Sequence, residues 1–148
     1  LAHLDDWSEF DTPGGALVRY ECHIDLGRIA AWDYAALPVG DPGRDRRAMD
    51  KHLATARRLR EIDMAGLPED RTMKTDKFLA QRARLLQATI DAAVGDTEVA
   101  RAELERLARI DTNAGPRDWG RLEVADGARR ELAKLPPKPP APDTPDDG

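Results

Sequence analysis

Short clusters of proline and glycine divide this sequence into segments, and that division constrains the fold more than any other feature. Proline lacks the backbone N–H that a helix interior needs, and glycine favours turns, so such clusters end helices and reverse the chain. The clusters lie at 37–43, 66–68, 95–96 and 113–116.

Between these breaks the apolar residues recur every three or four positions, which predicts amphipathic helices. The expected helices cover 13–37, 45–65, 75–94, 97–110 and 117–135, with a polar loop at 69–73 before the third. Thr12 followed by Pro13 is typical of a helix start, and Asp96 is suited to cap the fourth helix. The apolar stripe of the first helix is broad enough to predict contacts on two sides.

The composition favours an all-α protein. Apolar residues make up 41% of the chain and charged residues 34%, whereas aromatic residues account for only 5%, and almost no stretch alternates apolar and polar residues as a strand would. The formal net charge of -5 argues against a general nucleic-acid binder. A single cysteine, Cys22, excludes an internal disulfide framework and a multi-cysteine zinc site.

A repeated pattern links the second and fourth expected helices. Each ends in isoleucine followed by aspartate, at 62–63 and again at 110–111. The later segment has a turn glycine with an acidic residue, a small residue where helices cross and a closing aliphatic-aspartate pair. These features are carried by Gly95, Asp96, Ala100, Leu104, Leu107, Ile110 and Asp111, with Ala88 at the small position of the preceding helix.

This segment resembles the second half of a tetratricopeptide repeat. The resemblance implies two stacked helix hairpins followed by a C-terminal capping helix, over residues 13–135. It also implies a protein-interaction or assembly module that binds a partner segment through its helical surface.

Two flanking segments differ from the helical region. Residues 1–12 are acidic and carry Trp7 and Phe10, which we expect to pack on the first helix as a strap. Residues 136–148 are rich in proline and form an expected extended tail. No stretch approaches the roughly 20 apolar residues of a membrane span, and the sequence leaves open whether the protein is cytoplasmic, or exported or anchored through a segment before Leu1.

No motif points to catalysis or to a cofactor. Asp111, Asn113 and Gly115 open like a calcium loop, but Pro116 stands where that loop needs glycine and Leu122 where it needs glutamate. Neighbouring Cys22 and His23 would point about 100° apart on a helix, so they do not form a catalytic pair. The sequence therefore predicts no catalytic residue, no cofactor and no metal, and a protein that is not an enzyme.

The expected partner is another protein or a peptide segment, and a homo-oligomer is left open. The segment 44–60 is basic within an acidic chain, and it supplies five of the eight expected partner-binding residues. These are Tyr20, His23, Arg44, Arg47, Lys51, Arg57, Arg58 and Arg82. Two alternatives stay open: a ligand-binding or enzymatic pocket near Cys22, His23 and Trp32, and a contact with an anion or nucleic acid through residues 44–60.

Overall fold

The computed structural model describes residues 13–65, 69–110, 119–138 and 140, and within these ranges all regular structure is α-helical. The helices are α1 (Pro13–Ala36), α2 (Arg46–Ala65), α3 (Glu69–Val94), α4 (Thr97–Ala108) and α5 (Trp119–Lys134). The prediction of an all-α protein with five helices is confirmed. The strap at 1–12 and most of the tail lie outside the described residues.

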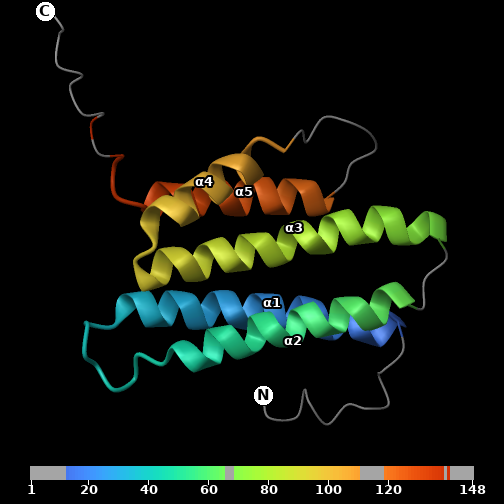
Figure 1. Ribbon diagram of the computed structural model, residues 1–148, viewed down its shortest axis with the longest axis horizontal. Coiled ribbons are helices and arrows are strands. Elements are labelled where there is room, and N and C mark those ends of the chain that lie inside the picture. Colours follow the sequence, from blue (N-terminus) through green and yellow to red (C-terminus); the bar gives the residue numbers. More distant parts are fainter. Residues whose placement is uncertain (1–12, 66–68, 111–118, 139, 141–148) are drawn as a thin grey trace, which may run out of the picture.

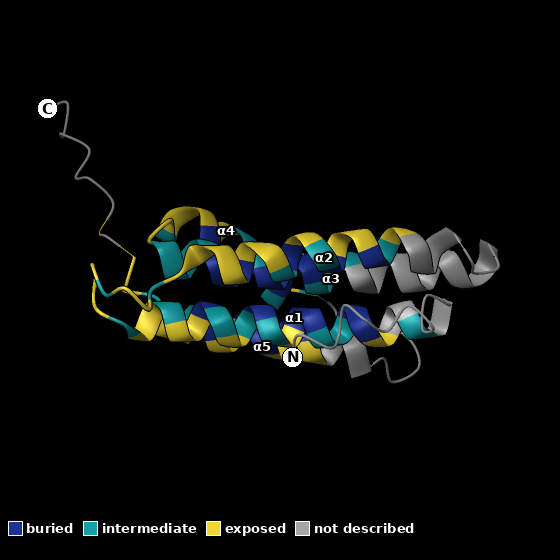
Figure 2. Cartoon of the chain, turned by 90° about the horizontal axis from the view of Figure 1, so that it is seen from below, coloured by how far each residue is buried: buried dark blue, intermediate teal, exposed yellow. Residues whose placement is uncertain are grey.

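Successive helices run in alternating directions, so that α1, α3 and α5 are parallel (Figure 1). α3 lies at the centre and packs against all four other helices, while α1 and α2 form the most extensive helix pair. Seen at right angles, α1 and α5 lie on one side of the molecule, and α2 and α4 lie on the other (Figure 2). The two-sided packing predicted for α1 is confirmed, because α1 contacts both α2 and α3.

Two glycines set the turns at the ends of the hairpins. Gly40 and Gly95 adopt φ values of 92° and 95°, a left-handed conformation that a residue with a Cβ rarely adopts. Asp96 follows Gly95 and accepts the first helical hydrogen bond through its carbonyl oxygen, from the backbone N–H of Ala100 at 3.0 Å. Asp96 is therefore the N-cap residue of α4, as predicted, although its side chain makes no capping hydrogen bond.

α3 begins earlier than the sequence suggested. The segment expected to be a loop, 69–73, is the first part of this helix. The helix opens with the acidic residues Glu69 and Asp70, and acidic residues are frequent in the first turn of helices. The polar composition of the segment therefore reflects a helix start rather than a loop.

Two hydrophobic cores flank α3. The first core lies among α1, α2 and α3, and consists of Tyr20, Ile24, Ala31, Met49, Leu53, Ala56, Leu59, Ala83, Leu86 and Ile90. The second core lies among α3, α4 and α5, and consists of Leu85, Ala88, Ala100, Leu104, Leu107, Val124 and Ala128. Adjacent leucines of α3, Leu86 and Leu85, thus belong to different cores.

Each of these leucines packs against a glycine of a neighbouring helix. A Cβ at Gly27 of α1 would lie 2.8 Å from Leu86 Cδ2, and a Cβ at Gly127 of α5 would lie 2.8 Å from Leu85 Cδ2. Gly127 therefore has a packing role inside α5, where glycine by itself disfavours a helix by about 1 kcal/mol relative to alanine.

Within the described ranges, no helix combines the length and the apolar character needed to cross a membrane.

Candidate functional site

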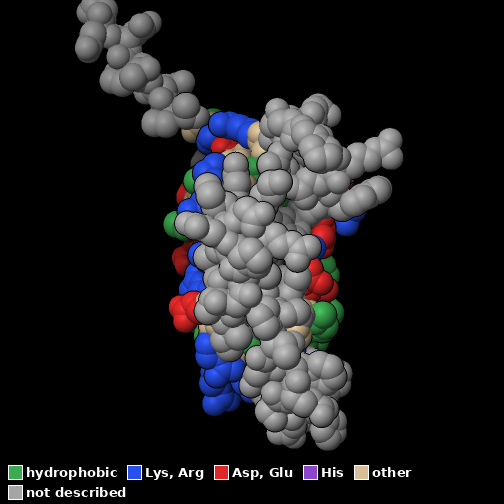
Figure 3. All heavy atoms as spheres, turned by 90° about the vertical axis from the view of Figure 1, so that its right-hand side faces the viewer, with side chains coloured by type: hydrophobic (Ala, Val, Ile, Leu, Met, Phe, Trp, Pro, Cys, Tyr) green, Lys and Arg blue, Asp and Glu red, His purple; other side chains and the backbone are tan. Residues whose placement is uncertain are grey.

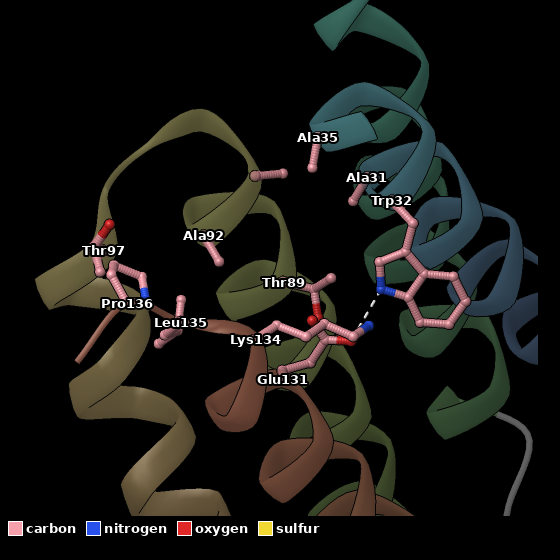
Figure 4. Close-up of a pocket in the computed structure, with 11 residues that line it drawn as sticks. Ala31, Trp32, Ala35, Thr89, Ala92, Thr97, Glu131, Lys134, Leu135 and Pro136 are labelled. Carbon is pink, nitrogen blue, oxygen red and sulfur yellow. Dashed lines mark hydrogen bonds and ion pairs between the residues drawn. The ribbon is translucent and has the colours of Figure 1, made fainter. Parts of the chain in front are cut away.

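A groove opens between the parallel helices α1 and α5, with α3 as its floor (Figure 4). Its volume is about 170 Å³. Small residues line most of it, which leaves room between the helices. The lining residues are Ala31, Trp32, Ala35, Thr89, Ala92, Ala93, Thr97, Glu131, Lys134, Leu135 and Pro136.

Thr89 lies at the floor of the groove, but its hydroxyl group is already hydrogen-bonded within the helix. This side chain is 2% exposed, and its hydroxyl donates a hydrogen bond to the carbonyl oxygen of Leu85 at 2.8 Å. The alanines beside it on α3 offer only methyl groups. The floor is therefore apolar, and the polar chemistry of the groove lies on its walls.

One wall holds a tryptophan that reaches across to α5. Trp32 of α1 is 39% exposed, and its indole Nε1 donates a hydrogen bond to Oε1 of Glu131 at 2.9 Å. Glu131 is only 4% exposed. Lys134, one turn further along α5, forms an ion pair with the same oxygen at 3.1 Å. These contacts stabilise a carboxylate that burial alone would disfavour.

Two cations lie over the Trp32 ring. Nζ of Lys134 lies 4.6 Å from the ring centroid, and the guanidinium carbon of Arg28 lies 5.2 Å from it. Arg28 reaches toward α5, where its Nη2 would lie 3.6 Å from a Cβ at Gly127. The indole is therefore the centre of a small charged cluster that joins α1 to α5.

A second charged contact joins the same helices through α3. Arg82 forms ion pairs with Glu21 of α1, at 3.2 Å, and with Glu123 of α5. Its side chain is 14% exposed. Arg82 was expected to contact a partner, whereas here it connects three helices of its own chain.

Tyr20 and His23, also expected to contact a partner, lie inside the molecule. Tyr20 is fully buried, and burial raises the pKa of its hydroxyl above the ordinary value, against opposing effects of Arg60 and Arg82. His23 is 3% exposed, and its Nδ1 lies 3.0 Å from Nδ1 of His52 on α2. Because helix packing covers both side chains, neither is accessible to a docked protein in this structure.

The basic residues at 44–60 have several contacts within the chain. Arg44 donates a hydrogen bond to the carbonyl oxygen of Tyr34 and stacks on its ring, and Arg57 donates one to Gln87. Arg47 pairs with Asp45, which lowers the pKa of that carboxyl through the hydrogen bond. Lys51 and Arg58 are exposed on α2.

Charges of both signs are also interspersed on the coloured part of the face in Figure 3. Several of the basic side chains at 44–60 therefore have partners within the chain, in hydrogen bonds and in ion pairs.

One of the three residues of the predicted pocket, Trp32, belongs to this groove. Trp32 lines the groove, but Cys22 and His23 do not. Cys22 is partly exposed elsewhere on α1. No set of three or more His, Cys, Asp or Glu residues that could hold a metal ion occurs in the described part of the chain.

The sequence did not single out Arg28, Glu131 or Lys134 as site residues. Trp32 and Glu131 lie 99 positions apart, so no local pattern links them. The three-residue spacing of Glu131 and Lys134 predicts an ion pair on a helix. The spacing does not indicate that an aromatic ring lies beside this pair.

Comparison with known proteins identifies no relative: no family profile matches the chain, and neither curated proteins nor solved structures give a match.

Proposed function

We propose that this protein is an interaction module that binds a segment of a partner protein in the groove between α1, α3 and α5. The observation that carries the proposal is the groove itself, with its apolar floor and a partly exposed tryptophan on its wall. Exposed aromatic side chains beside small apolar pockets are typical anchors of protein interfaces.

The order of the helices supports this proposal. Most lining residues of the groove come from the three parallel helices, α1, α3 and α5 (Figure 1). Thr97 at the start of α4 and the two residues after α5 complete the lining, and α2 contributes no lining residue. Stacked helix hairpins commonly bind extended partners along a surface formed by one helix of each pair. The tetratricopeptide-like arrangement expected from the sequence is part of this proposal.

The size of the groove favours a peptide side chain over a metabolite. Small-molecule sites usually enclose about 300–1,000 Å³, whereas this groove encloses about 170 Å³. A space of this size accepts one side chain of a longer segment. For that reason we favour a protein partner over a substrate.

A stripe of exposed side chains on α1, apolar at three positions and interrupted by the exposed Asp25, extends the surface beyond the groove. Val18, Ile29 and Trp32 are 55%, 48% and 39% exposed. Their spacing of eleven and three residues places them on one side of the helix. A partner segment anchored beside Trp32 could continue along this stripe.

A blocking substitution tests the proposal. Ala35 is exposed and lines the groove, so Ala35→Arg fills the groove without disturbing either core. Ala54→Arg is the matched control, because Ala54 is an exposed alanine on α2. A photoreactive amino acid at position 35 would first identify the partner, which would then be purified and its affinity measured.

We expect Ala35→Arg to weaken partner binding at least tenfold and Ala54→Arg to leave it unchanged. Equal affinities of the two variants for the crosslinked partner would place binding outside the groove and refute the proposal. Turnover of a substrate by the purified protein, together with no crosslinked partner, would refute it as well.

A further inference from the structure

The groove already holds a cation, and this cation belongs to the chain itself. Nζ of Lys134 lies 3.1 Å from a Glu131 carboxylate oxygen and 4.6 Å from the centroid of the Trp32 ring (Figure 4). An ammonium group within about 6 Å of an aromatic face is attracted to the ring, and a carboxylate adds a charge-assisted hydrogen bond. Trp32 and Glu131 together therefore form a cradle for a cation.

The cradle is held in place independently of Lys134. The hydrogen bond from Trp32 Nε1 to Glu131 orients the indole and the carboxylate relative to each other. Glu131 is 4% exposed, and its neighbour on the same face of α5, Ala128, lies in the second core. When Lys134 leaves, these two side chains still face one another.

Lys134 itself is loosely held. Its side chain is 55% exposed, and it is the final residue of α5. When the Lys134 ammonium group leaves the carboxylate, it is hydrated by the surrounding water and its long side chain regains conformational freedom. Lys134 can therefore give way to another cation.

The carboxylate also has unused acceptor capacity. Both of its hydrogen bonds, from Trp32 and from Lys134, are made by Oε1. Oε2 makes no hydrogen bond to any residue in the described ranges, although a carboxylate accepts about four. A cation with several N–H donors could use both oxygens.

Arg28 limits the number of cations that can surround the Glu131 carboxylate. Its guanidinium group already lies over the Trp32 ring, at 5.2 Å. A guest that joined Lys134 and Arg28 around one carboxylate would be repelled. A guest that replaces Lys134 leaves the local charge unchanged.

We propose that the Trp32–Glu131 cradle binds the ammonium or guanidinium group of a basic side chain on the partner segment, and that Lys134 occupies the cradle until the partner arrives. The inference rests on the proposed function, because it names the chemistry of the anchoring residue. It agrees with the size of the groove, which admits one side chain. It also agrees with the net charge of -5, which attracts basic segments.

The experiment uses small probes in place of the unidentified partner. Binding of n-butylammonium and n-butylguanidinium to the full chain is followed by NMR, through the indole N–H resonance of Trp32, which a Trp32→Phe variant assigns. n-Butanol and sodium butyrate are the uncharged and anionic comparisons. Lys134→Gln and Glu131→Gln are each paired with a control of the same type elsewhere, Lys51→Gln on α2 and Glu103→Gln on α4.

We expect both cations to shift the Trp32 resonance and to saturate, with n-butanol and butyrate much weaker. Lys134→Gln should tighten binding of the cations by about threefold to tenfold, because it removes the competitor. Glu131→Gln should weaken it at least tenfold, because it removes the charge but retains an acceptor for the indole. The two control variants should bind as the wild type does.

Two results would overturn the inference. One is tighter binding of butyrate than of butylammonium, which would make the groove an anion site. The other is an unchanged or weaker affinity for the cations in Lys134→Gln, and this surface variant gives a clear answer even if Glu131→Gln fails to fold.

These failures differ from failure of the proposed function. If a crosslinked partner binds the wild type, loses affinity in Ala35→Arg and is indifferent to Lys134→Gln and Glu131→Gln, the groove is a docking site without cation recognition. If the cations bind but the partner ignores Ala35→Arg, the cradle exists but does not serve the partner.

Discussion

The two cores on either side of α3 are built from different side chains. The core shared with α1 and α2 includes a tyrosine and a methionine, and the part-buried His23–His52 contact links the same two helices. Among the residues that the structure describes, the buried side chains of the core shared with α4 and α5 are alanine, leucine and valine, and Ile110 packs against them. Adjacent positions of α3 therefore contribute to two kinds of core. We call the core shared with α1 and α2 the mixed core, and the core shared with α4 and α5 is purely aliphatic.

The two sides of α3 also differ in where they hold these polar side chains. On the α1–α2 side, polar atoms lie within the helix interface. On the α4–α5 side they lie at the margin, where Glu131 faces Trp32 across the groove. A carboxylate at the margin of an aliphatic core can meet an incoming ligand, whereas a group inside the core cannot. The candidate site therefore lies where the two halves meet.

The largest expected effects come from the two leucines of α3. Leu86→Ala and Leu85→Ala should each lower the free energy of unfolding by about 2–5 kcal/mol, because each leaves a cavity in its own core. Chemical denaturation measures the loss. Hydrogen exchange then separates the halves: Leu86→Ala should expose amides of α1 and α2, and Leu85→Ala those of α4 and α5. An identical exchange pattern in both variants would mean that the cores do not differ in local stability.

The two helix glycines should respond differently to alanine. A Cβ at Gly27 would lie 2.8 and 3.0 Å from both methyl groups of Leu86 and 3.3 Å from His52 Cβ, so Gly27→Ala should cost about 1–3 kcal/mol. At Gly127 only one methyl group, of Leu85, lies closer than 3.6 Å. The gain in helix propensity, about 1 kcal/mol, offsets a small shift there. Thermal denaturation that ranks Gly127→Ala below Gly27→Ala in stability would contradict this reading of the two interfaces.

Alkaline pH should destabilise the mixed core selectively. Burial raises the pKa of Tyr20, so its stabilising effect is complete below the ordinary value near 10 and is lost as pH rises above it, when the unfolded chain ionises first. The expected loss is up to about 1.4 kcal/mol per pH unit. Urea denaturation between pH 9 and 11 should show a steeper decline for the wild type than for Tyr20→Phe. Parallel declines would show that Tyr20 ionises as readily in the folded protein as in the unfolded chain.

The smallest expected effect lies on the surface of the α4–α5 half. The hydrogen bond from Arg106, at 2.8 Å, lowers the pKa of Glu103, so the pair stabilises the fold above the ordinary value near 4.5 and loses this effect as pH falls. Both side chains are well exposed, at 47% and 30%, and Glu103→Gln should cost only about 0.5 kcal/mol or less at pH 7. The difference from wild type should vanish near pH 3. A loss that persists there would point to packing instead of charge.

The helices could be predicted from the sequence because the features that define a helix lie close together in the chain. Gly40 and Gly95 mark turns, and the spacing of apolar residues defines the segments between them. The start of α3 was missed because Glu69 and Asp70 occur in loops and at helix starts alike, and only the three-dimensional context distinguishes the two.

The candidate site was less predictable, since it depends on contacts between distant segments. Trp32 was noted as part of a pocket, but Glu131 becomes its neighbour only when α1 and α5 pack side by side. Tyr20 and Arg82 were assigned to a partner because buried and exposed positions look alike on a helix with apolar residues on several sides. In the structure Tyr20 is fully buried and the side chain of Arg82 is 14% exposed, and burial is a property of the assembled fold.

The anchoring of residue 136 gives the groove a practical use. Arg101, itself 9% exposed, donates a hydrogen bond to the carbonyl oxygen of Pro136, and Pro136 lines the groove. The chain therefore leaves the helical fold at the mouth of the groove. A peptide fused beyond this point by a flexible linker would meet the groove at an effective concentration in the millimolar range. Weak ligands could then be compared as intramolecular fusions, at dilutions where the separate molecules would not associate.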